Sequence, residues 1–264
     1  MLVAHSLTMS QSLSTHCSCV HGGYSCSIRQ PGANYRRARQ GGVMYTFDLV
    51  FFCLSVALYA AYNLYIRHKE AVAPGFTIHG ISRTARVQWV ASVLENKNGI
   101  LAVQTLRNAT MASTFMASTS VLLAVGVLSL TGNGENVRHT WHSLNFFGSV
   151  TSDMFALKIL ALLLNFFLAF FCFTSSLRLY THVAFMLGAE GGPEDKSHMG
   201  CMAEKYLNMG ANHFSLGMRA FYFTVPLVFW IFGAQFMFFG TIFLISIVYA
   251  LDKTPKQVMH QQND

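Results

Sequence analysis

The distribution of charged residues along the chain constrains its fold more than any other feature of the sequence. Asp, Glu, Lys and Arg are missing from four long intervals of 18, 27, 19 and 32 residues, which lie at 49–66, 108–134, 159–177 and 220–251. A helix needs about 20 consecutive, predominantly apolar residues to cross the hydrocarbon core of a bilayer. The intervals therefore predict four transmembrane helices. We place them at 45–66, 103–130, 154–175 and 221–250.

The overall composition excludes an ordinary soluble protein. Charged residues make up 11% of the 264 residues and hydrophobic residues 53%, whereas soluble domains carry roughly 25% charged residues. So little polar sequence cannot cover four core helices in water. The net charge of +7 comes from 18 basic residues that the apolar intervals keep apart, which argues against a nucleic-acid-binding domain. We attribute the pI of about 9.2 to loops that face an anionic membrane surface.

The first 43 residues differ from the rest of the chain. They contain many serines, no acidic residue and a late cluster of arginines, and they lack the apolar stretch of a secretory signal. Such leaders resemble organellar transit peptides, but a disordered leader, or an extension upstream of Met44, fits as well. We exclude 1–43 from the fold and expect a membrane domain at 44–252 and a polar tail at 253–264. A plasma membrane or endomembrane is favoured, and the leader allows an organellar membrane.

The sequence offers little for metal, cofactor or covalent chemistry. Three of the six cysteines lie in the leader, two in predicted spans and one alone in a loop, and no pair has the CxxC spacing of a zinc or redox site. His139 and His142 are three residues apart, but spacing indicates no third metal ligand. The predicted spans have no central histidine for a haem, and no hydrolase, metalloprotease or nucleotide-binding motif occurs. We therefore expect no metal, no cofactor and no enzymatic activity.

Four spans would place both chain termini on one side of the membrane and the loops at 67–102 and 176–219 on the other. These loops and the helix ends beside them contain ten basic residues. The opposite side contains four if the leader is left out and eight if it is counted. Because Lys and Arg are enriched in cytoplasmic loops, we expect both loops in the cytoplasm.

The loops contain two amphipathic segments. In 82–98, Val87, Val90 and Val93 recur at helical spacing, with Ser82 as a candidate N-cap. Such a basic helix would lie along the membrane surface or pack on its neighbours as a cytosolic helix. A second candidate is 197–210. The expected fold class is thus all-α, a polytopic membrane protein with four transmembrane helices and one or two short amphipathic cytoplasmic helices.

Three stretches resemble a known family. They are LAVQTLRNATMAST at 101–114, FALKILALLLNFFLAFFCFTSSLRLYTHVAFMLG at 155–188, and FSLGMRAFYFTVPLVFWIFG at 214–233 with YALD at 249–252. In this order they are similar to the uncharacterised membrane family catalogued as domain of unknown function 599, which occurs in plants, algae and bacteria. The resemblance covers about 44–252 and implies a four-helix membrane architecture, but no reaction. It also implies a proline after Gly233, where this chain has Ala234.

The second predicted span carries small residues at four-residue spacing, Ala109, Ser113 and Ala117, with hydroxyl residues on the adjoining row. Rows of small residues allow helix backbones to approach closely, and hydroxyl groups can bond across the contact. We expect tight packing inside the bundle. A homodimer seam and a polar conduit are the alternatives.

Polar residues gather at the predicted cytoplasmic ends of three spans. Ionisable groups at membrane depth are functional candidates, and arginine can hold a phosphate bidentately. We therefore predict that one arginine from each of these ends reaches a common anion, most simply a lipid phosphate. Snorkelling arginines that only fix helix depth are the alternative. The candidate residues are Gln104, Arg107, Asn108, Arg178, His182 and Arg219, of which Arg107, Arg178 and Arg219 form the predicted ring.

Two further expectations concern residues within the spans. An unpaired charge in the membrane is expensive, so Lys158 is expected to pair with Asp48 of another span. Pro226 removes a backbone donor, which predicts a kink in the last span.

Two functions fit these observations. The first is a non-enzymatic integral membrane protein whose cytoplasmic basic ring binds anionic lipid or a partner protein, with a homo-oligomer as one arrangement. The second is an oligomeric channel or transporter for a small solute or ion, with the hydroxyl row and Gln235 lining its path. A dry contact around the hydroxyl row favours the first function, and a water-filled cavity favours the second.

Overall fold

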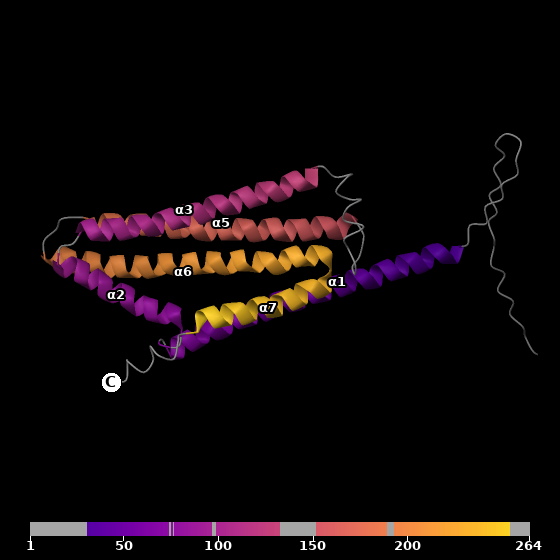
Figure 1. Cartoon of the computed structure of the whole chain (residues 1–264), viewed down its shortest axis with the longest axis horizontal. Helices are drawn as coiled ribbons and strands as arrows, with labels where there is room; N and C mark the ends of the chain where they lie inside the picture. The colour runs from indigo at the N-terminus through magenta and orange to yellow at the C-terminus, as the bar shows by residue number, and fades with distance from the viewer. Residues whose placement is uncertain are drawn as a thin grey trace, which may run out of the picture. The chain divides into compact units, whose positions relative to one another are not determined.

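The computed structural model describes residues 31–73, 75, 77–96, 99–132, 152–188 and 193–253, and within these residues the chain is helical (Figure 1). This confirms the all-α class. The chain divides into two compact units, Met1–Val43 and Met44–Asp264, and the following description concerns the second. The helices are α1 Pro31–Val72, α2 Ile78–Asn96, α3 Gly99–Gly132, α5 Ser152–Gly188, α6 Pro193–Phe232 and α7 Ala234–Asp252.

The backbone of 31–43, part of the leader that we excluded, is described as the first portion of α1. The rest of the leader and the predicted tail at 254–264 lie outside the described residues, as do His139 and His142.

Among the described residues, five helices are long and apolar enough to cross a membrane, as a multi-pass membrane protein requires. The predicted number of four spans is therefore not matched. The first three predicted spans correspond to α1, α3 and α5, whereas the predicted span at 221–250 is divided between two helices. The apolar segments are Tyr45–Val72, Gly99–Ser129, Met154–Gly188, His198–Phe232 and Ala234–Asp252.

The division occurs at Gly233. Its backbone has φ 157° and ψ 151°, a combination that is essentially restricted to glycine. Helix α6 contains Pro226 and continues beyond it to Phe232. After Gly233 the chain reverses, and α7 packs back along α6. Their contact is close at Gly240, where an added Cβ would lie 2.7 Å from the Phe229 ring.

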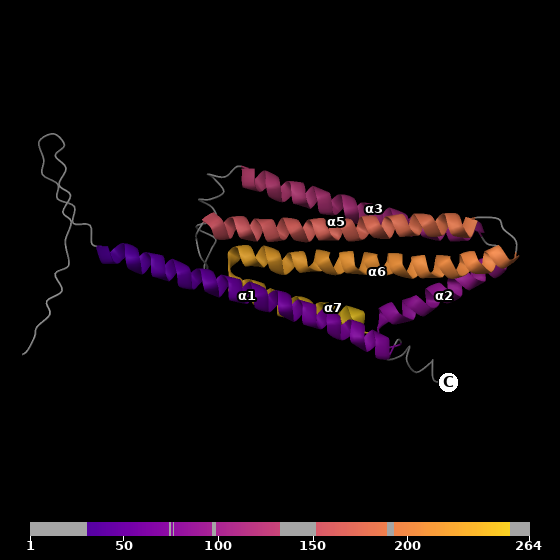
Figure 2. The same ribbon diagram turned by 180° about the vertical axis from the view of Figure 1, so that it is seen from behind.

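The helices pack with α5 between α3 and α6 (Figures 1 and 2). Helix α7 and the part of α1 after Met44 lie side by side along α6, as the contact between Phe51 and Phe238 shows. Their buried apolar residues form one core. We call this part the main bundle. Its core consists of Tyr59, Tyr62, Ile66, Ala124, Leu162, Phe166, Phe223, Leu227, Trp230, Ala234, Met237, Leu244 and Val248.

Four of the described helices, α1, α3, α5 and α6, are longer than the hydrocarbon core of a bilayer is thick. Helix α6 has 40 residues and is therefore about 60 Å long at a rise of 1.5 Å per residue, against a hydrocarbon core of about 30 Å. Helix α7, with 19 residues, matches that thickness. Because the last residue of α7, Asp252, meets Arg219, the part of α6 before Arg219 continues beyond the end of α7.

This continuation forms a second core with α2, the start of α3 and the end of α5. We call it the helical extension. Its core contains Val90, Val93, Ala102, Leu106, Tyr180, Val183, Leu187, Ala203 and Leu207.

The predicted amphipathic segments both belong to the helical extension. Helix α2 begins at Ile78, four residues before the predicted start, because Thr77 caps it: the Gly80 N–H donates to Thr77 Oγ1 at 3.1 Å. Its buried valines, Val90 and Val93, pack on α6 and α3, which is the arrangement of a helix packed on its neighbours. The second segment, 197–210, is not a separate helix but the first part of α6.

A buried ion pair joins α1 to α5 in the main bundle. Lys158 Nζ lies 4.0 Å from Asp48 Oδ2, and both side chains are 4% exposed, which confirms the predicted pairing. The ammonium group also lies 5.7 Å from the centre of the Trp230 ring, and Phe52 stacks on the same ring. The pair and its aromatic neighbours thus connect α1, α5 and α6.

We predict that the end of α7 and the α1–α3 connection lie on the same side of the membrane. In a chain without its native cysteines, Ser92→Cys and Lys253→Cys should react with a membrane-impermeant maleimide from one side of sealed vesicles, and Tyr45→Cys from the other. Five spans require this result. If Ser92→Cys and Lys253→Cys were labelled from opposite sides, the chain would have four spans.

We also predict that Lys158→Met lowers the free energy of unfolding by about 3 kcal/mol or more, because it leaves a buried carboxylate without its cation. Thermal unfolding in detergent measures the loss. The double variant Asp48→Leu, Lys158→Met removes both charges and should recover most of it. A double variant as unstable as the single one would show that the charge pairing is not the cause.

Candidate functional site

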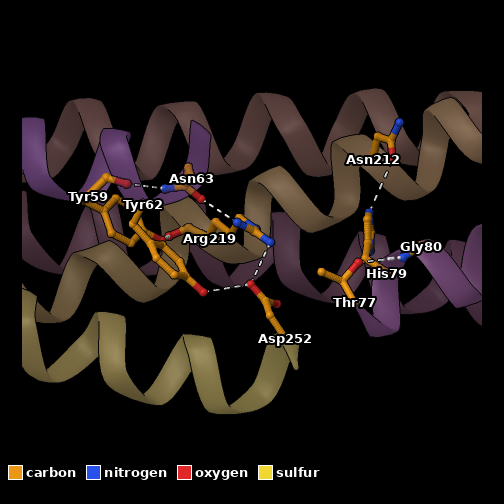
Figure 3. Close-up of polar contacts among 9 residues, drawn as sticks. All are labelled: Tyr59, Tyr62, Asn63, Thr77, His79, Gly80, Asn212, Arg219 and Asp252. Carbon is orange, nitrogen blue, oxygen red and sulfur yellow. Dashed lines mark hydrogen bonds and ion pairs between the residues drawn. The ribbon is translucent and has the colours of Figure 1, made fainter. Parts of the chain in front are cut away.

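One arginine binds groups from two other helices (Figure 3). Arg219 of α6 donates from Nη2 to Asp252 Oδ2 of α7 at 2.9 Å, and from Nη1 to Asn63 Oδ1 of α1 at 2.6 Å. Tyr62 donates its hydroxyl to the same Asp252 oxygen at 3.1 Å. The Arg219 and Asp252 side chains are only 14% and 22% exposed, so solvent screens this ion pair little.

The α1 side of this arrangement is held by Tyr59. Its hydroxyl donates to the Arg219 carbonyl oxygen at 2.8 Å, and its ring stacks on Phe223 with centroids 4.8 Å apart. Asn63 donates from Nδ2 to the Tyr59 carbonyl at 2.8 Å, which leaves Oδ1 to accept from Arg219. We call Tyr59, Tyr62, Asn63, Arg219 and Asp252 the Arg219 clamp.

A cavity of about 470 Å³ lies beside the clamp, where the end of α1 and the start of α2 meet α6. Arg67 and Arg83 on its wall are exposed, and neither has a hydrogen-bond or ion-pair partner among the described residues. One wall also carries His79, whose Nε2 lies 3.4 Å from Asn212 Oδ1. We call it the Arg67 cavity. It is lined by Arg67, Glu70, Ala71, His79, Arg83, Met209, Asn212, His213, Ser215, Leu216 and Arg219.

A second cavity of about 350 Å³ lies between α2, α5, α6 and α7. Arg86 donates from Nε to Asn208 Oδ1 at 2.9 Å, while its Nη2 is buried and has no hydrogen-bond partner among the described residues. Burial lowers the pKa of the Arg86 guanidinium. We call this the Arg86 cavity. Its lining is Ile78, His79, Ser82, Arg86, Tyr180, Ala211, Phe214, Ser215, Met218, Arg219, Tyr222, Val248, Leu251 and Asp252.

The structure does not bring the three arginines of the predicted ring to one site. The Arg219 guanidinium is bonded to α1 and α7, whereas Arg107 lies on α3, on the other side of α5. Arg107 and Arg178 are exposed, and neither lines one of the two cavities. The prediction treated all three as boundary residues, but α3 and α5 continue into the helical extension. The other candidates, Gln104, Asn108 and His182, are exposed there as well.

The small-residue row of α3 faces α5. Ser113 is fully buried, its Oγ donates to the Ala109 carbonyl at 3.0 Å, and it lies 3.5 Å from Ser176 Oγ. Ala117 is buried in a small core with Phe173 and other residues of α5 and α6. Ala109 is half-buried against the core of the helical extension.

The sequence contained signals for the clamp that we did not use. Asn63 is the one amide in its uncharged interval, and Asp252 ends the longest such interval. Arg67 and Arg83 were counted only as loop charges. Within the described residues, no three His, Cys, Asp or Glu side chains are grouped so as to hold a metal ion.

A family model described as "Protein of unknown function, DUF599" matches residues 50–257. The chain belongs to this family. The match spans the Arg219 clamp and both cavities of this DUF599 protein, and it confirms the resemblance noted in the sequence. The chain has no significant match to a curated protein or to a solved structure.

We predict that Asp252→Asn weakens the attachment of α7. The Arg219 guanidinium loses its anionic partner, and hydrogen bonds to charged groups contribute about 1.5–3 kcal/mol. The melting temperature should fall, and amide hydrogen exchange should rise in the last turns of α7. Glu95→Gln, an exposed acid-to-amide change on α2, is the control. If Asp252→Asn affects stability no more than Glu95→Gln, the clamp does not hold α7.

Proposed function

We propose that this protein is a non-enzymatic, multi-pass membrane protein that binds the phosphate group of an anionic phospholipid in the Arg67 cavity. The supporting observation is that Arg67 and Arg83 face one cavity without a partner among the described residues. Two guanidinium groups can form paired, charge-assisted hydrogen bonds with phosphate oxygens. Arg219 also lines the cavity, but Asp252 already balances its charge.

The position of the cavity supports a lipid as the source of the phosphate. Arg67 is the first charged residue after the 18-residue apolar interval of α1. The cavity also borders Arg219, which marks the level where α7 ends. A headgroup would lie at this level if α1 and α7 cross the bilayer, and its chains would lie along their exposed apolar side chains, such as Leu64.

The charge distribution supports a cytoplasmic location for the cavity. With five spans, the cavity side carries twelve basic residues and the other side six, including the leader. This contrast is larger than four spans gave, and it favours a cytoplasmic location for the end of α7 too. Cytoplasmic leaflets carry the anionic lipids that such a site needs. The twelve are Arg67, Lys69, Arg83, Arg86, Lys97, Arg107, Arg178, Lys196, Lys205, Arg219, Lys253 and Lys256.

The hydroxyl row of α3 favours binding over a channel or transporter. Ser113 lies in a dry contact with Ser176, and Thr110 and Thr114 donate to carbonyls of their own helix. Neither cavity is lined by a residue of α3. Gln235 is exposed on α7 and lines neither cavity.

We predict that Arg67→Gln and Arg83→Gln each lower the amount of co-purified anionic phospholipid about fivefold. A specific ion pair made by an exposed arginine contributes up to about 1 kcal/mol of binding free energy, which corresponds to that factor. Lipid mass spectrometry of the purified protein, normalised to bound neutral lipid, measures the effect.

Arg107→Gln and Arg178→Gln are the matched controls, because both arginines are exposed on the same side but lie outside the cavities. Melting temperatures should stay unchanged in all four variants. Equal loss of anionic lipid in all four would indicate general attraction to the membrane surface and would contradict a site in the Arg67 cavity.

A further inference from the structure

The Arg86 cavity is lined by an arginine, Arg86, that is not part of the proposed phospholipid site. Arg86 lines this cavity and is absent from the lining of the Arg67 cavity. One donor of its guanidinium, Nη2, is buried and has no hydrogen-bond partner in the part of the chain that the structure describes. Leaving a buried donor of a charged group unpaired is costly, so a ligand that accepts a hydrogen bond there would remove an existing penalty.

The charge balance of the Arg86 cavity leaves room for one negative charge. Its second arginine, Arg219, is paired with Asp252, which is also part of the lining. Within the described residues, the hydrogen-bond partner of Arg86 is the neutral amide of Asn208, and an arginine stays charged in a protein even when burial lowers its pKa. A monoanion therefore fits the site better than a dianion.

The lining of the cavity combines polar and apolar side chains. Ser82, Arg86 and Tyr180 bring two hydroxyl groups and the guanidinium from α2 and α5. Met218, Val248 and Leu251 provide apolar wall from α6 and α7, and Leu251 is 57% exposed at the end of an apolar span. The volume of about 350 Å³ lies within the range of small-molecule sites. Such a site suits a molecule with a small anionic head and an apolar tail.

We propose that the Arg86 cavity binds a single-chain fatty acid, with its carboxylate on the Arg86 guanidinium and the first part of its acyl chain along Met218, Val248 and Leu251. The polar side chains of the lining would bind the carboxylate, and the apolar side chains would contact the acyl chain. The rest of the chain leaves the cavity at Leu251, toward the membrane. This site is separate from the phospholipid site, although His79, Ser215 and Arg219 border both cavities.

Photo-crosslinking tests the fatty-acid site. The full chain is placed in nanodiscs of neutral phosphatidylcholine and labelled with a 16-carbon fatty acid that carries a diazirine near its carboxylate. We expect mass spectrometry to locate the label at Met218 or at 248–251. We also expect unlabelled palmitic acid to compete at least tenfold better than hexadecanol or hexadecyl phosphate. A label spread over the exposed apolar faces, or equal competition by the three compounds, would overturn the proposal.

The neighbouring arginines of α2 provide a matched pair of variants. Arg86→Gln should weaken palmitic acid binding about tenfold or more, because hydrogen bonds to charged groups are strong. Arg83 lies three residues earlier and lines only the Arg67 cavity, so Arg83→Gln should leave palmitic acid binding unchanged. The same two variants have the opposite order of effects on co-purified phospholipid, so either proposal can fail without the other. Equal palmitic acid binding by Arg86→Gln and the unaltered chain would exclude this site.

Ser82→Glu separates loss of binding from loss of folding. Position 82 is one helical turn before Arg86, and a glutamate four residues before an arginine pairs well on a helix. The substitution would supply the missing acceptor from within the chain. We expect a melting temperature equal to or above that of the unaltered protein, together with loss of palmitic acid crosslinking. A stable variant that still binds palmitic acid would contradict the proposal.

Discussion

The arrangement of the helices around the two cavities depends on the Arg219 guanidinium. A charge at this depth needs a partner of opposite charge, and Arg219 obtains it from Asp252 while Asn63 accepts its second donor. These two bonds join α6 to α1 and to α7. They are geometrically feasible only because the chain reverses at Gly233, which returns α7 to the level of Arg219. The ion pair therefore depends on the reversal.

The cavities lie where the main bundle meets the helical extension. Helices α1 and α7 end at this level, whereas α3, α5 and α6 continue, and α2 packs against the continuing part of α6. Where two helices end and others continue, packing is interrupted and space remains between them. Polar groups can occupy such a space because it borders both the apolar spans and water. This location explains why arginines and apolar side chains line the same cavities.

The spacing of charged residues was sufficient to predict the apolar blocks. It was not sufficient to predict how many membrane-spanning helices these blocks form. The interval before Asp252 has 32 uncharged residues, and a reversal through Gly233 alone adds no polar loop to divide it. The length of the interval, well above a single span, was the available signal. The Asp48–Lys158 pair was predictable because an unpaired charge inside the membrane is costly and few charged residues lie within the predicted spans. The Arg219 clamp was not, since it requires knowing that α7 returns to α6.

The two cavities differ in a way that sequence position alone does not show. Arg83 and Arg86 are three residues apart on α2, yet the first is exposed in one cavity and the second is half-buried in the other. On an α-helix, three residues turn the side chain by about 300°, so neighbouring rows of α2 face different surroundings. The exposed arginine remains hydrated and can attract a headgroup from the membrane surface. The half-buried one has lost part of its hydration without gaining a full set of partners among the described residues, so a bound anion gains more from it. One helix thus presents two cations of unequal hydration, and this difference would allow the protein to distinguish two anionic lipids.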